Sequence, residues 1–289
     1  MRLNFEQQVS GVYASLSEKL RQAADYVVEH PVDVATRSLR SVSKDAGLSP
    51  AAFSRMSAAL GYDSYEDLRD VLRLSIKRQP SSFSQRVDAL QQRHEAGKID
   101  FGTQHVADCV ANIQDIANLF QGPPLEHAVD KLQKARRVLV FGGLGSTGVA
   151  EYLTYMANFV ADNWSMASRM GASLSSGLVG MDERDVLIVI TKPPFANKAV
   201  SAAKGAREAG IFVIVISDTH TCPALQYASA ALNVRTDSQH FFSSYAATLV
   251  LAEIIVGMLA ARLGNAARNR IAKVEEHNRE LGEIWVDGP

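Results

Sequence analysis

A glycine-rich turn offers the clearest chemistry in the sequence. The letters GGLGSTG follow the strand predicted at Val138–Phe141 and precede the helix-like stretch VAEYLTYMANFV. In this strand–turn–helix context the spacing matches G-x-G-x-x-G, a motif whose backbone N–H groups stabilise an anion at a helix N-terminus. The motif alone does not separate a dinucleotide pyrophosphate from a sugar phosphate, and glycines there also serve close strand–helix packing. The motif glycines and the two hydroxyl residues beside them are Gly143, Gly145, Gly148, Ser146 and Thr147.

A dinucleotide site lacks one of its usual parts in this sequence. Such a site has an acidic residue at the end of the second strand, where it binds the ribose diol. If that strand is Trp164–Ser168, the next residue is Arg169, which suits a 2′-phosphate and not a diol. A nicotinamide-sensing repressor therefore stays open as one alternative.

Polar residues also follow two later apolar runs. Thr191 and Lys192 come after RDVLIVI, and Ser217 comes after the strand predicted at Ile211–Ile216. Open α/β sheets bind ligands outside the carboxyl ends of their strands. We therefore expect these three side chains in the same ligand site as the glycine turn.

The elements that carry these residues differ between the two halves of the chain. From about residue 137, β-branched runs alternate with helical stretches, which is typical of βαβ units around a parallel sheet. The runs are continuously apolar, which predicts helices on both faces of the sheet. Residues 12–78 instead indicate short helices. We predict an all-α helix-turn-helix domain at 1–78, a linker at 79–103, an α/β three-layer parallel-sheet domain at 104–270 and a C-terminal tail at 271–289.

The helix-turn-helix prediction rests on the turn between two short helices. Gly47 permits the positive φ that a tight turn requires, and Ser49 can cap a helix that starts at Pro50. Small side chains on the free face of this helix allow close approach to the DNA major groove, where Arg55 reaches a guanine edge or a phosphate. An ordinary helical bundle with a glycine C-cap is the alternative. The predicted DNA-contacting residues are Arg40, Lys44, Ser49, Ala51, Ala52, Ser54 and Arg55.

Composition and charge exclude several classes of protein. Apolar residues make up 47% and charged residues 21% of the 289 residues, so the chain is neither disordered nor low-complexity. The net charge of −1 excludes a globally cationic coat protein. Cys109 and Cys222 are too few for a disulfide framework or a structural zinc site. The start of the chain lacks a signal-peptide pattern and Tyr245–Leu263 carries Glu253, so we expect a buried core helix in a soluble, cytoplasmic protein.

Taken together, these features resemble the RpiR family of bacterial transcription regulators. The resemblance is carried by an AGLS turn with an arginine six residues after its serine, by LGYDSYEDL, and by a G-x-G-x-x-G domain after a short linker. It runs from about Ser10 to about Gly264. It implies a Rossmann-like sugar isomerase (SIS) domain that senses a phosphosugar or a related metabolite. The residues that it assigns to the recognition helix and the ligand loops are Ser49, Ala52, Arg55, Gly143, Gly145, Thr147, Ser243 and Ser244. His240, close to these two serines, is a further ligand candidate, with a surface or interface histidine as the alternative.

The second ligand loop departs from the pattern of that family. Family members show Ser-x-Ser-Gly-x-Thr there, whereas this chain reads TKPPFA from Thr191 onward. Pro193 and Pro194 remove two backbone donors, and Lys192 supplies a point charge in place of the amide cradle. We therefore expect the ligand to differ from a standard sugar phosphate, for example a small carboxylate or an unphosphorylated sugar derivative, with Phe195 as an apolar wall. A Pro-Pro turn without a ligand role is the alternative.

Three functions are compatible with these observations. A ligand-responsive transcription regulator accounts for both halves, binding operator DNA as a homodimer or homotetramer. A sugar-phosphate isomerase needs a positioned base, and Glu151, Glu253 and His240 are available without any mark of that role. The nicotinamide-sensing repressor is the third. We predict the first, with no catalytic residue, cofactor, metal or membrane, and with helices such as Tyr245–Leu263 joining the SIS domains.

Overall fold

The computed structural model of the chain describes residues 5–76, 82–98, 100–167, 173–219 and 222–285. They form two compact units. The helical unit comprises residues 1–111, 218–222 and 237–244, and the sheet unit comprises residues 112–217, 223–236 and 245–289. Each unit contains its own cluster of buried apolar side chains, and each is described by itself below.

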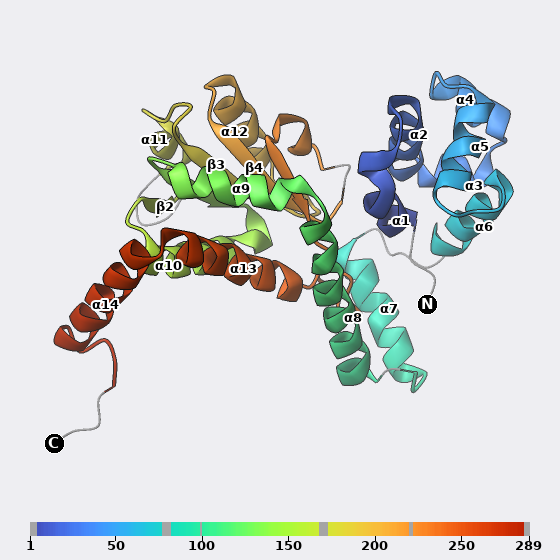
Figure 1. The fold of residues 1–289 in the computed structure, drawn as a ribbon. Helices are drawn as coiled ribbons and strands as arrows, with labels where there is room; N and C mark the ends of the chain where they lie inside the picture. Colours follow the sequence, from blue (N-terminus) through green and yellow to red (C-terminus); the bar gives the residue numbers. More distant parts are fainter. Residues whose placement is uncertain (1–4, 77–81, 99, 168–172, 220–221, 286–289) are drawn as a thin grey trace. The chain divides into compact units, whose positions relative to one another are not determined.

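Short helices build the first part of the helical unit, as predicted. They are α1 (Phe5–Val12), α2 (Glu18–Glu29), α3 (Pro31–Thr36), α4 (Leu39–Asp45), α5 (Pro50–Ala59) and α6 (Tyr65–Ile76) (Figure 1). The hydroxyl groups of Ser38, Ser49 and Ser64 each accept a hydrogen bond from the backbone N–H three residues later, which starts α4, α5 and α6. Gly47 has a φ of 66° between α4 and α5, so the turn has the conformation that the sequence predicted.

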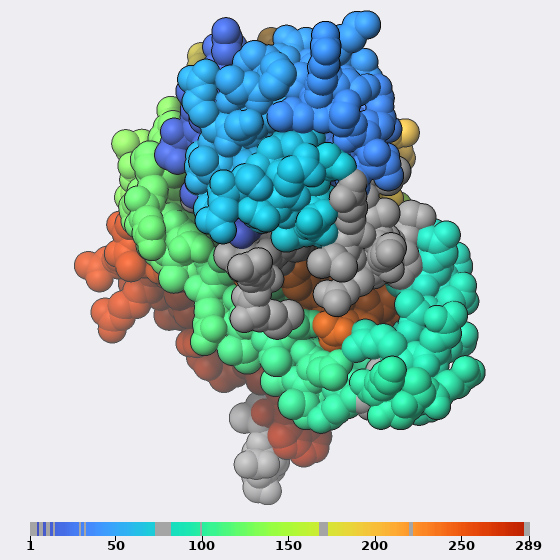
Figure 2. All heavy atoms as spheres, turned by 90° about the vertical axis from the view of Figure 1, so that its right-hand side faces the viewer, coloured from blue at the N-terminus to red at the C-terminus, as the bar shows by residue number. Residues whose placement is uncertain are grey.

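Aromatic rings organise the core of these helices. Phe53 of α5 is fully buried, and its ring centroid lies 6.1 Å from those of both Tyr26 and Tyr65 in edge-on contacts. Figure 2 shows the helices, in blue and cyan, as one filled body. Pro31 begins α3, because proline suits the first helical position.

The stretch predicted as a linker contains a further helix. Helix α7 (Phe83–Glu95) begins with a capping box, in which Ser82 and Gln85 exchange side chain–backbone hydrogen bonds. Helix α8 (Phe101–Asp115) follows and starts three residues before the domain boundary predicted at residue 104. No residue of α7 is fully buried among the described residues, so its polar sequence has the composition of a linker. That composition is why the sequence did not predict it.

The sheet unit is built on one parallel sheet with strand order β2-β1-β3-β4-β5. Every residue of β1 and β3 is buried, which confirms the prediction from the continuous apolar runs. Helices α9, α10 and α13 cover one face and α11 and α12 cover the other (Figure 1). The strands are β1 (Val138–Gly142), β2 (Trp164–Met166), β3 (Val186–Ile190), β4 (Phe212–Ser217) and β5 (Ala230–Asn233). The helices are α9 (Pro123–Lys134), α10 (Thr147–Val160), α11 (Leu174–Leu178), α12 (Asn197–Glu208) and α13 (Ala246–Leu263).

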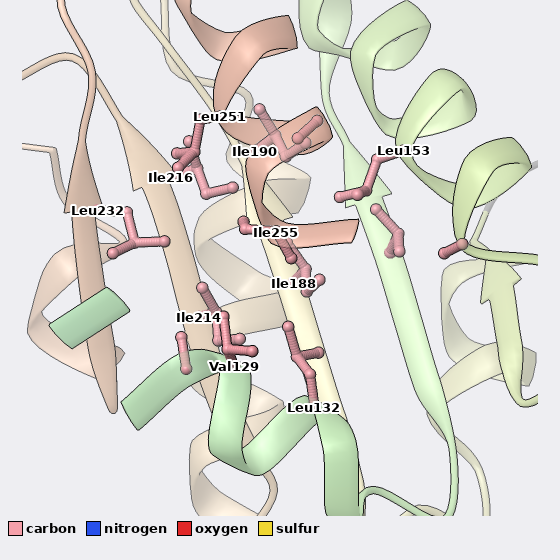
Figure 3. Close-up of a cluster of buried hydrophobic side chains, with 14 of the residues drawn as sticks. Val129, Leu132, Leu153, Ile188, Ile190, Ile214, Ile216, Leu232, Leu251 and Ile255 are labelled. Atoms are coloured by element: carbon pink, nitrogen blue, oxygen red, sulfur yellow. The ribbon is translucent and has the colours of Figure 1, made fainter. Parts of the chain in front are cut away.

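Alternate strand residues fill the core on the α9–α10–α13 face. Figure 3 shows Ile188 and Ile190 of β3 close to Leu251 and Ile255 of α13. Ile190 is in register with Ile216 of β4, so the two strands end side by side. The residues that directly follow these strands therefore meet at one edge of the sheet.

Helix α13 is apolar on all sides but buried on one side only. Leu251 and Ile255 are buried, whereas Glu253 and Gly257 are exposed. Among the described residues, α13 is the one helix long and apolar enough to cross a membrane by length and composition, and 33% of it is buried. The predicted core helix is therefore confirmed for the face that packs on the sheet. Helix α14 (Asn265–Glu280) follows and runs through the boundary predicted at residue 270.

Candidate functional site

The candidate ligand site lies at the carboxyl edge of the sheet, where the strand order reverses. Strand β1 has β2 on one side and β3 on the other, so the connections after β1 and β3 run in opposite directions. Open α/β sheets bind ligands at such a switch point. The turn after β1 contains Gly143, Gly145, Ser146 and Thr147, and the turn after β3 begins at Thr191.

The glycine turn and the turn after β3 approach each other closely. A Cβ atom on Gly143 would lie 2.6 Å from the Cβ of Ala196, closer than real side-chain contacts allow. A Cβ on Gly142 would lie 2.4 Å from the carbonyl oxygen of Ser146. By contrast, Gly148 has open space around it. Close packing therefore explains Gly143, and it joins the two turns into one surface.

The two hydroxyl residues of the glycine turn have partners within the sheet unit. Ser146 is fully buried, and its Oγ lies 3.1 Å from the hydroxyl of Tyr245, the residue before α13. Thr147 Oγ1 donates to the turn itself, 2.8 Å from the carbonyl oxygen of Leu144. Leu144 has a φ of 53°, a left-handed conformation that non-glycine residues rarely adopt, and it is exposed at the tip of the turn. A ligand at this turn would meet the backbone first.

Lys192 is the buried cation of this edge. It is 4% exposed, and its Nζ donates a hydrogen bond to the carbonyl oxygen of Val234 at 3.2 Å. The same Nζ lies 5.7 Å from the ring centroid of Tyr245. The next peptide bond but one, between Pro193 and Pro194, is cis. The structure thus places Lys192 among the predicted ligand residues, on the same tyrosine as Ser146.

Three buried hydroxyl groups at this edge have no hydrogen-bond partner in the described part of the chain. They belong to Thr191, Ser217 and Thr248. The N–H of Thr191 donates to the carbonyl oxygen of Ile216 at 3.1 Å, which places Thr191 beside Ser217. A buried hydroxyl without a partner costs about 1–3 kcal/mol, so such groups mark a place for a ligand or bound water. The sequence predicted Thr191 and Ser217 but missed Thr248, whose only signal is a hydroxyl in the first turn of an apolar helix.

The structure groups the remaining ligand candidates differently. His240, Ser243 and Ser244 belong to the segment of the helical unit that comprises residues 237–244. Ser244 Oγ lies 3.3 Å from the Sγ of Cys109 on α8, and His240 Nδ1 accepts a hydrogen bond from the N–H of Phe242. A contact between these residues and a ligand stays a prediction. Arg169, considered for a 2′-phosphate, lies outside the described residues.

The structure also shows where the carboxylates considered for an isomerase lie. No group of three or more histidine, cysteine, aspartate or glutamate side chains there could hold a metal ion. Among the bases considered for an isomerase, Glu253 accepts a hydrogen bond from the hydroxyl of Tyr152 on the exposed side of α13. Glu151 is exposed on α10.

The predicted DNA-contacting residues lie on α4 and α5, except Ser49, which directly precedes α5. Arg40, Lys44, Ala51, Ser54 and Arg55 are exposed, and Ser49 caps α5. Ala52 was predicted to face outward and is instead buried, with 5% of its surface exposed. Its position explains the difference, since it lies one turn before Met56 and next to Phe53 on the face that packs inward. The guanidinium of Arg55 reaches back toward the carbonyl oxygen of Ala51 at 3.4 Å.

Comparisons with known proteins agree with this architecture. Residues 131–258 match the model of the SIS domain family. YbbH of Bacillus subtilis, named an HTH-type transcriptional regulator, is 23% identical over 255 residues, which cover 85% of this chain and 86% of YbbH. Among solved structures, the sugar isomerase domain of an RpiR transcription factor from Sphaerobacter thermophilus is 21% identical, with a TM-score of 0.58, and covers 62% of this chain and 99% of its own. The Vibrio vulnificus NanR protein complexed with ManNAc-6P is 17% identical, with a TM-score of 0.57, and covers 96% of this chain and 99% of its own.

Proposed function

We infer that this chain is a ligand-responsive regulator of transcription. It matches the SIS domain and is related along most of its length to HTH-type transcriptional regulators, in agreement with its resemblance to the RpiR family. The observation that carries this proposal is the pairing of two sites in one chain. One is an exposed, serine-capped helix after a glycine turn, and the other is the carboxyl edge of a parallel sheet with unpartnered buried hydroxyl groups. The cytoplasm is the compartment where such a protein would act.

The DNA-binding part of the proposal rests on the free surface of α4 and α5. Arg40, Lys44 and Arg55 are exposed cations there, and Ala51 and Ser54 are small enough to admit a DNA backbone or base edge. An arginine with a bidentate base contact contributes about 1–3 kcal/mol to the choice of base. We therefore expect Arg55 to contribute to sequence-specific binding and Lys44 to bind phosphates.

The DNA test uses the full chain and fragmented genomic DNA of its source organism. Fragments that the protein enriches are then titrated one by one by fluorescence anisotropy. We expect Arg55→Ala to weaken binding to the enriched fragment by about 5- to 150-fold, while Lys19→Ala, an exposed substitution on α2, leaves it unchanged. If no fragment is enriched and the chain interconverts an aldose and a ketose, the isomerase is the correct function.

For the effector, we propose a small anionic or polyhydroxylated metabolite, namely a sugar phosphate or a related sugar or carboxylate. The buried ammonium of Lys192 favours an anion, and the hydroxyls of Thr191, Ser217 and Thr248 suit a ligand rich in hydroxyl groups. The NanR complex makes N-acetylmannosamine 6-phosphate the first compound to try.

The effector test compares thermal shifts with four classes of compound. These are N-acetylmannosamine 6-phosphate, hexose 6-phosphates, the same sugars without phosphate, and small carboxylates. Stabilisation by one class, lost in Thr191→Val, supports the site at the carboxyl edge. Stabilisation by hexose phosphates alone would contradict the sequence-based expectation that Pro193 and Pro194 exclude a standard sugar phosphate. NADPH is added as a control, and an increase in the unfolding temperature with NADPH alone would favour the nicotinamide-sensing alternative.

We further propose that the outer face of α10 and α13 pairs with a second copy of the chain. Tyr152 and Tyr155 are 37% and 62% exposed there, and Gly257 is exposed on α13. On this face the carboxylate of Glu253 accepts a hydrogen bond from Tyr152, and the exposed tyrosine rings offer surface for a contact between two identical faces. Tyr155→Glu should lower the mass measured by light scattering, whereas Val179→Glu, at an equally exposed position of the same unit, should not. An unchanged mass in Tyr155→Glu would contradict this interface.

A further inference from the structure

Both ends of the connection between β5 and α13 contact the side chain of Lys192. This connection, defined here as residues 234–245, has Val234 at one end and Tyr245 at the other. Lys192 Nζ donates to the carbonyl oxygen of Val234 at 3.2 Å and lies 5.7 Å from the ring centroid of Tyr245. Val234 N–H also donates to the carbonyl oxygen of Ser217 at 2.7 Å. The ammonium of Lys192 therefore holds the two ends of the connection together.

The middle of the connection is fastened to the α7–α8 hairpin within the helical unit. Gln239 accepts a hydrogen bond from Arg93 of α7 at 2.7 Å and donates one to Asp108 of α8 at 3.0 Å. Ser238 Oγ lies 3.3 Å from Nδ1 of His105. Aromatic contacts add to these bonds, since the ring centroid of Phe242 lies 5.1 Å from that of Phe83 in a stacked arrangement.

These bonds give the connection an unusual position in the chain. It leaves the sheet unit after Thr236, contributes residues 237–244 to the helical unit, and returns to the sheet unit at Tyr245. Its ends belong to the candidate ligand site, and its middle belongs to the helices that follow the proposed DNA-binding part in sequence. A change at its ends has a covalent route to that hairpin.

We propose that Lys192 is a positioning residue that holds the connection 234–245, and that an anionic effector acts by competing for its ammonium. This inference rests on the proposed function. A phosphate or carboxylate oxygen carries a formal negative charge, whereas two of the groups that contact the ammonium, the carbonyl of Val234 and the ring of Tyr245, offer only partial charge. An anion adds a full charge–charge attraction to the hydrogen bond, so an anion at the glycine turn draws the ammonium from these two partners.

The glycine turn already shares a partner with Lys192. Ser146 Oγ lies 3.1 Å from the Tyr245 hydroxyl, on the same ring that the ammonium approaches. An effector bound at the turn is therefore positioned to affect Tyr245 from two sides. The effect on DNA binding is limited by the difference in effector affinity between the two positions of the connection.

The first experiment follows hydrogen exchange of the full-length protein without any added ligand. Lys192→Met keeps the apolar stem and removes the ammonium. We expect amides of residues 237–244 and of α8 to exchange about tenfold faster, the size expected when a hydrogen bond to a charged group is lost. Lys198→Met, an exposed position on α12, serves as the control and should leave exchange unchanged. Exchange in Lys192→Met that equals wild type would overturn the proposal.

A second arm tests the effector and allows for a variant that folds poorly. Lys192→Gln removes the charge and keeps a hydrogen-bond donor, and the DNA affinity of this variant without a probe is the reference for its own probe response. N-acetylmannosamine 6-phosphate and inorganic phosphate are the probes, and either should change DNA affinity in wild type and not in Lys192→Gln. A probe response in Lys192→Gln equal to that of wild type would contradict the role of the ammonium. A wild-type chain that binds no DNA would instead contradict the proposed function, and the exchange experiment would still decide the role of Lys192.

Discussion

The buried polar residues before and after β3 differ in how far their hydrogen-bonding groups are satisfied. At the amino edge, just before β3, the carboxylate of Asp185 is fully buried and accepts two hydrogen bonds from Arg136, at 3.0 and 2.6 Å. It also accepts one from the N–H of Asp182 at 2.9 Å. At the carboxyl edge, the hydroxyls of Thr191 and Ser217 are buried without a partner in the described part of the chain. The carboxylate of Asp185 therefore contributes to folding, whereas the hydroxyls of Thr191 and Ser217 are available to a ligand or bound water.

Electrostatics shows how well the carboxylate of Asp185 is satisfied. Burial raises the pKa of Asp185, but the hydrogen bonds from Arg136 and from the Asp182 N–H outweigh it and keep that pKa below its ordinary value. The carboxylate is therefore charged and stable inside the protein. The difference between the edges predicts that substitutions at the amino edge change stability, whereas substitutions at the carboxyl edge change the response to ligand.

The largest expected effect is the loss of Asp185. Asp185→Ala removes the acceptor of the Asp182 N–H and two hydrogen bonds of the Arg136 guanidinium, which keeps Asp182 and the carbonyl of Gly180 as partners. Because a hydrogen bond to a charged group contributes about 1.5–3 kcal/mol, we expect a total loss of about 3–5 kcal/mol. Urea unfolding followed by circular dichroism measures this free energy. Glu183→Ala, two residues away and exposed, is the matched control and should change it by less than about 0.5 kcal/mol. Equal effects of the two substitutions would remove the distinction between the edges.

The same pair predicts a dependence on pH. Because the pKa of Asp185 is lower in the folded state, its contribution is complete above its unfolded pKa of about 4 and is lost as the pH falls through the folded value. The stability difference between wild type and Asp185→Ala should therefore be constant from pH 7 to about pH 5 and narrow below about pH 4. Urea midpoints at four pH values test this. If the stability difference between wild type and Asp185→Ala grows as the pH falls, the pKa of Asp185 is raised by folding and this prediction is wrong.

A smaller effect is expected where the two turns of the carboxyl edge touch. Gly143→Ala places a methyl group 2.6 Å from the Cβ of Ala196, and such overpacking costs about 1–3 kcal/mol. Gly148→Ala, in the same motif but with open space, should instead be neutral or stabilising by up to about 1 kcal/mol, because alanine is the better helix former. Thermal unfolding of both variants without ligand separates packing from ligand binding. Destabilisation by both would mean that the motif is rigid throughout.

The smallest effect has the opposite sign. Thr191→Val replaces an unpartnered buried hydroxyl by a methyl group of similar shape, so the protein without ligand should be unchanged or more stable by about 1 kcal/mol. The effector response should be lost at the same time. Ser229→Ala is the comparison, since the hydroxyl of Ser229 accepts a hydrogen bond from the N–H of Val213 at 3.1 Å and its loss should destabilise. Destabilisation by Thr191→Val would show that its hydroxyl already has a structural partner.

Much of the fold follows from local sequence rules. Strands β1, β3 and β4 were visible because continuous β-branched runs have few alternative structures. The turn between α4 and α5 was visible because Gly47 and Ser49 each have one strong local role. Helix α7 was missed because a polar helix stabilised by a capping box has the composition of a linker. The orientation of Ala52 was wrong because alanine fits both faces of a helix and only tertiary packing decides.

The candidate site was predicted less completely than the fold. Residues that follow strands were found, since the end of a strand fixes their place at one edge of the sheet. Thr248 was missed because it reaches that edge from the start of α13, and a long connection separates it from the strands. The contacts of residues 237–244 with α7 and α8 depend on residues more than 130 positions apart in several cases, and no local pattern encodes them.

The separate cores also bear on how such a chain can be recombined. The buried apolar cluster of the first helices contains residues from Phe5 to Leu72, and that of the sheet unit begins only at Ile116, so the two have no member in common. A gene fusion with its breakpoint between codons 76 and 82 would therefore cut through neither cluster. Replacing helices α1–α6 by a DNA-binding domain of known target, while retaining the rest of the chain, is a direct way to build a reporter strain that reveals the unidentified metabolite.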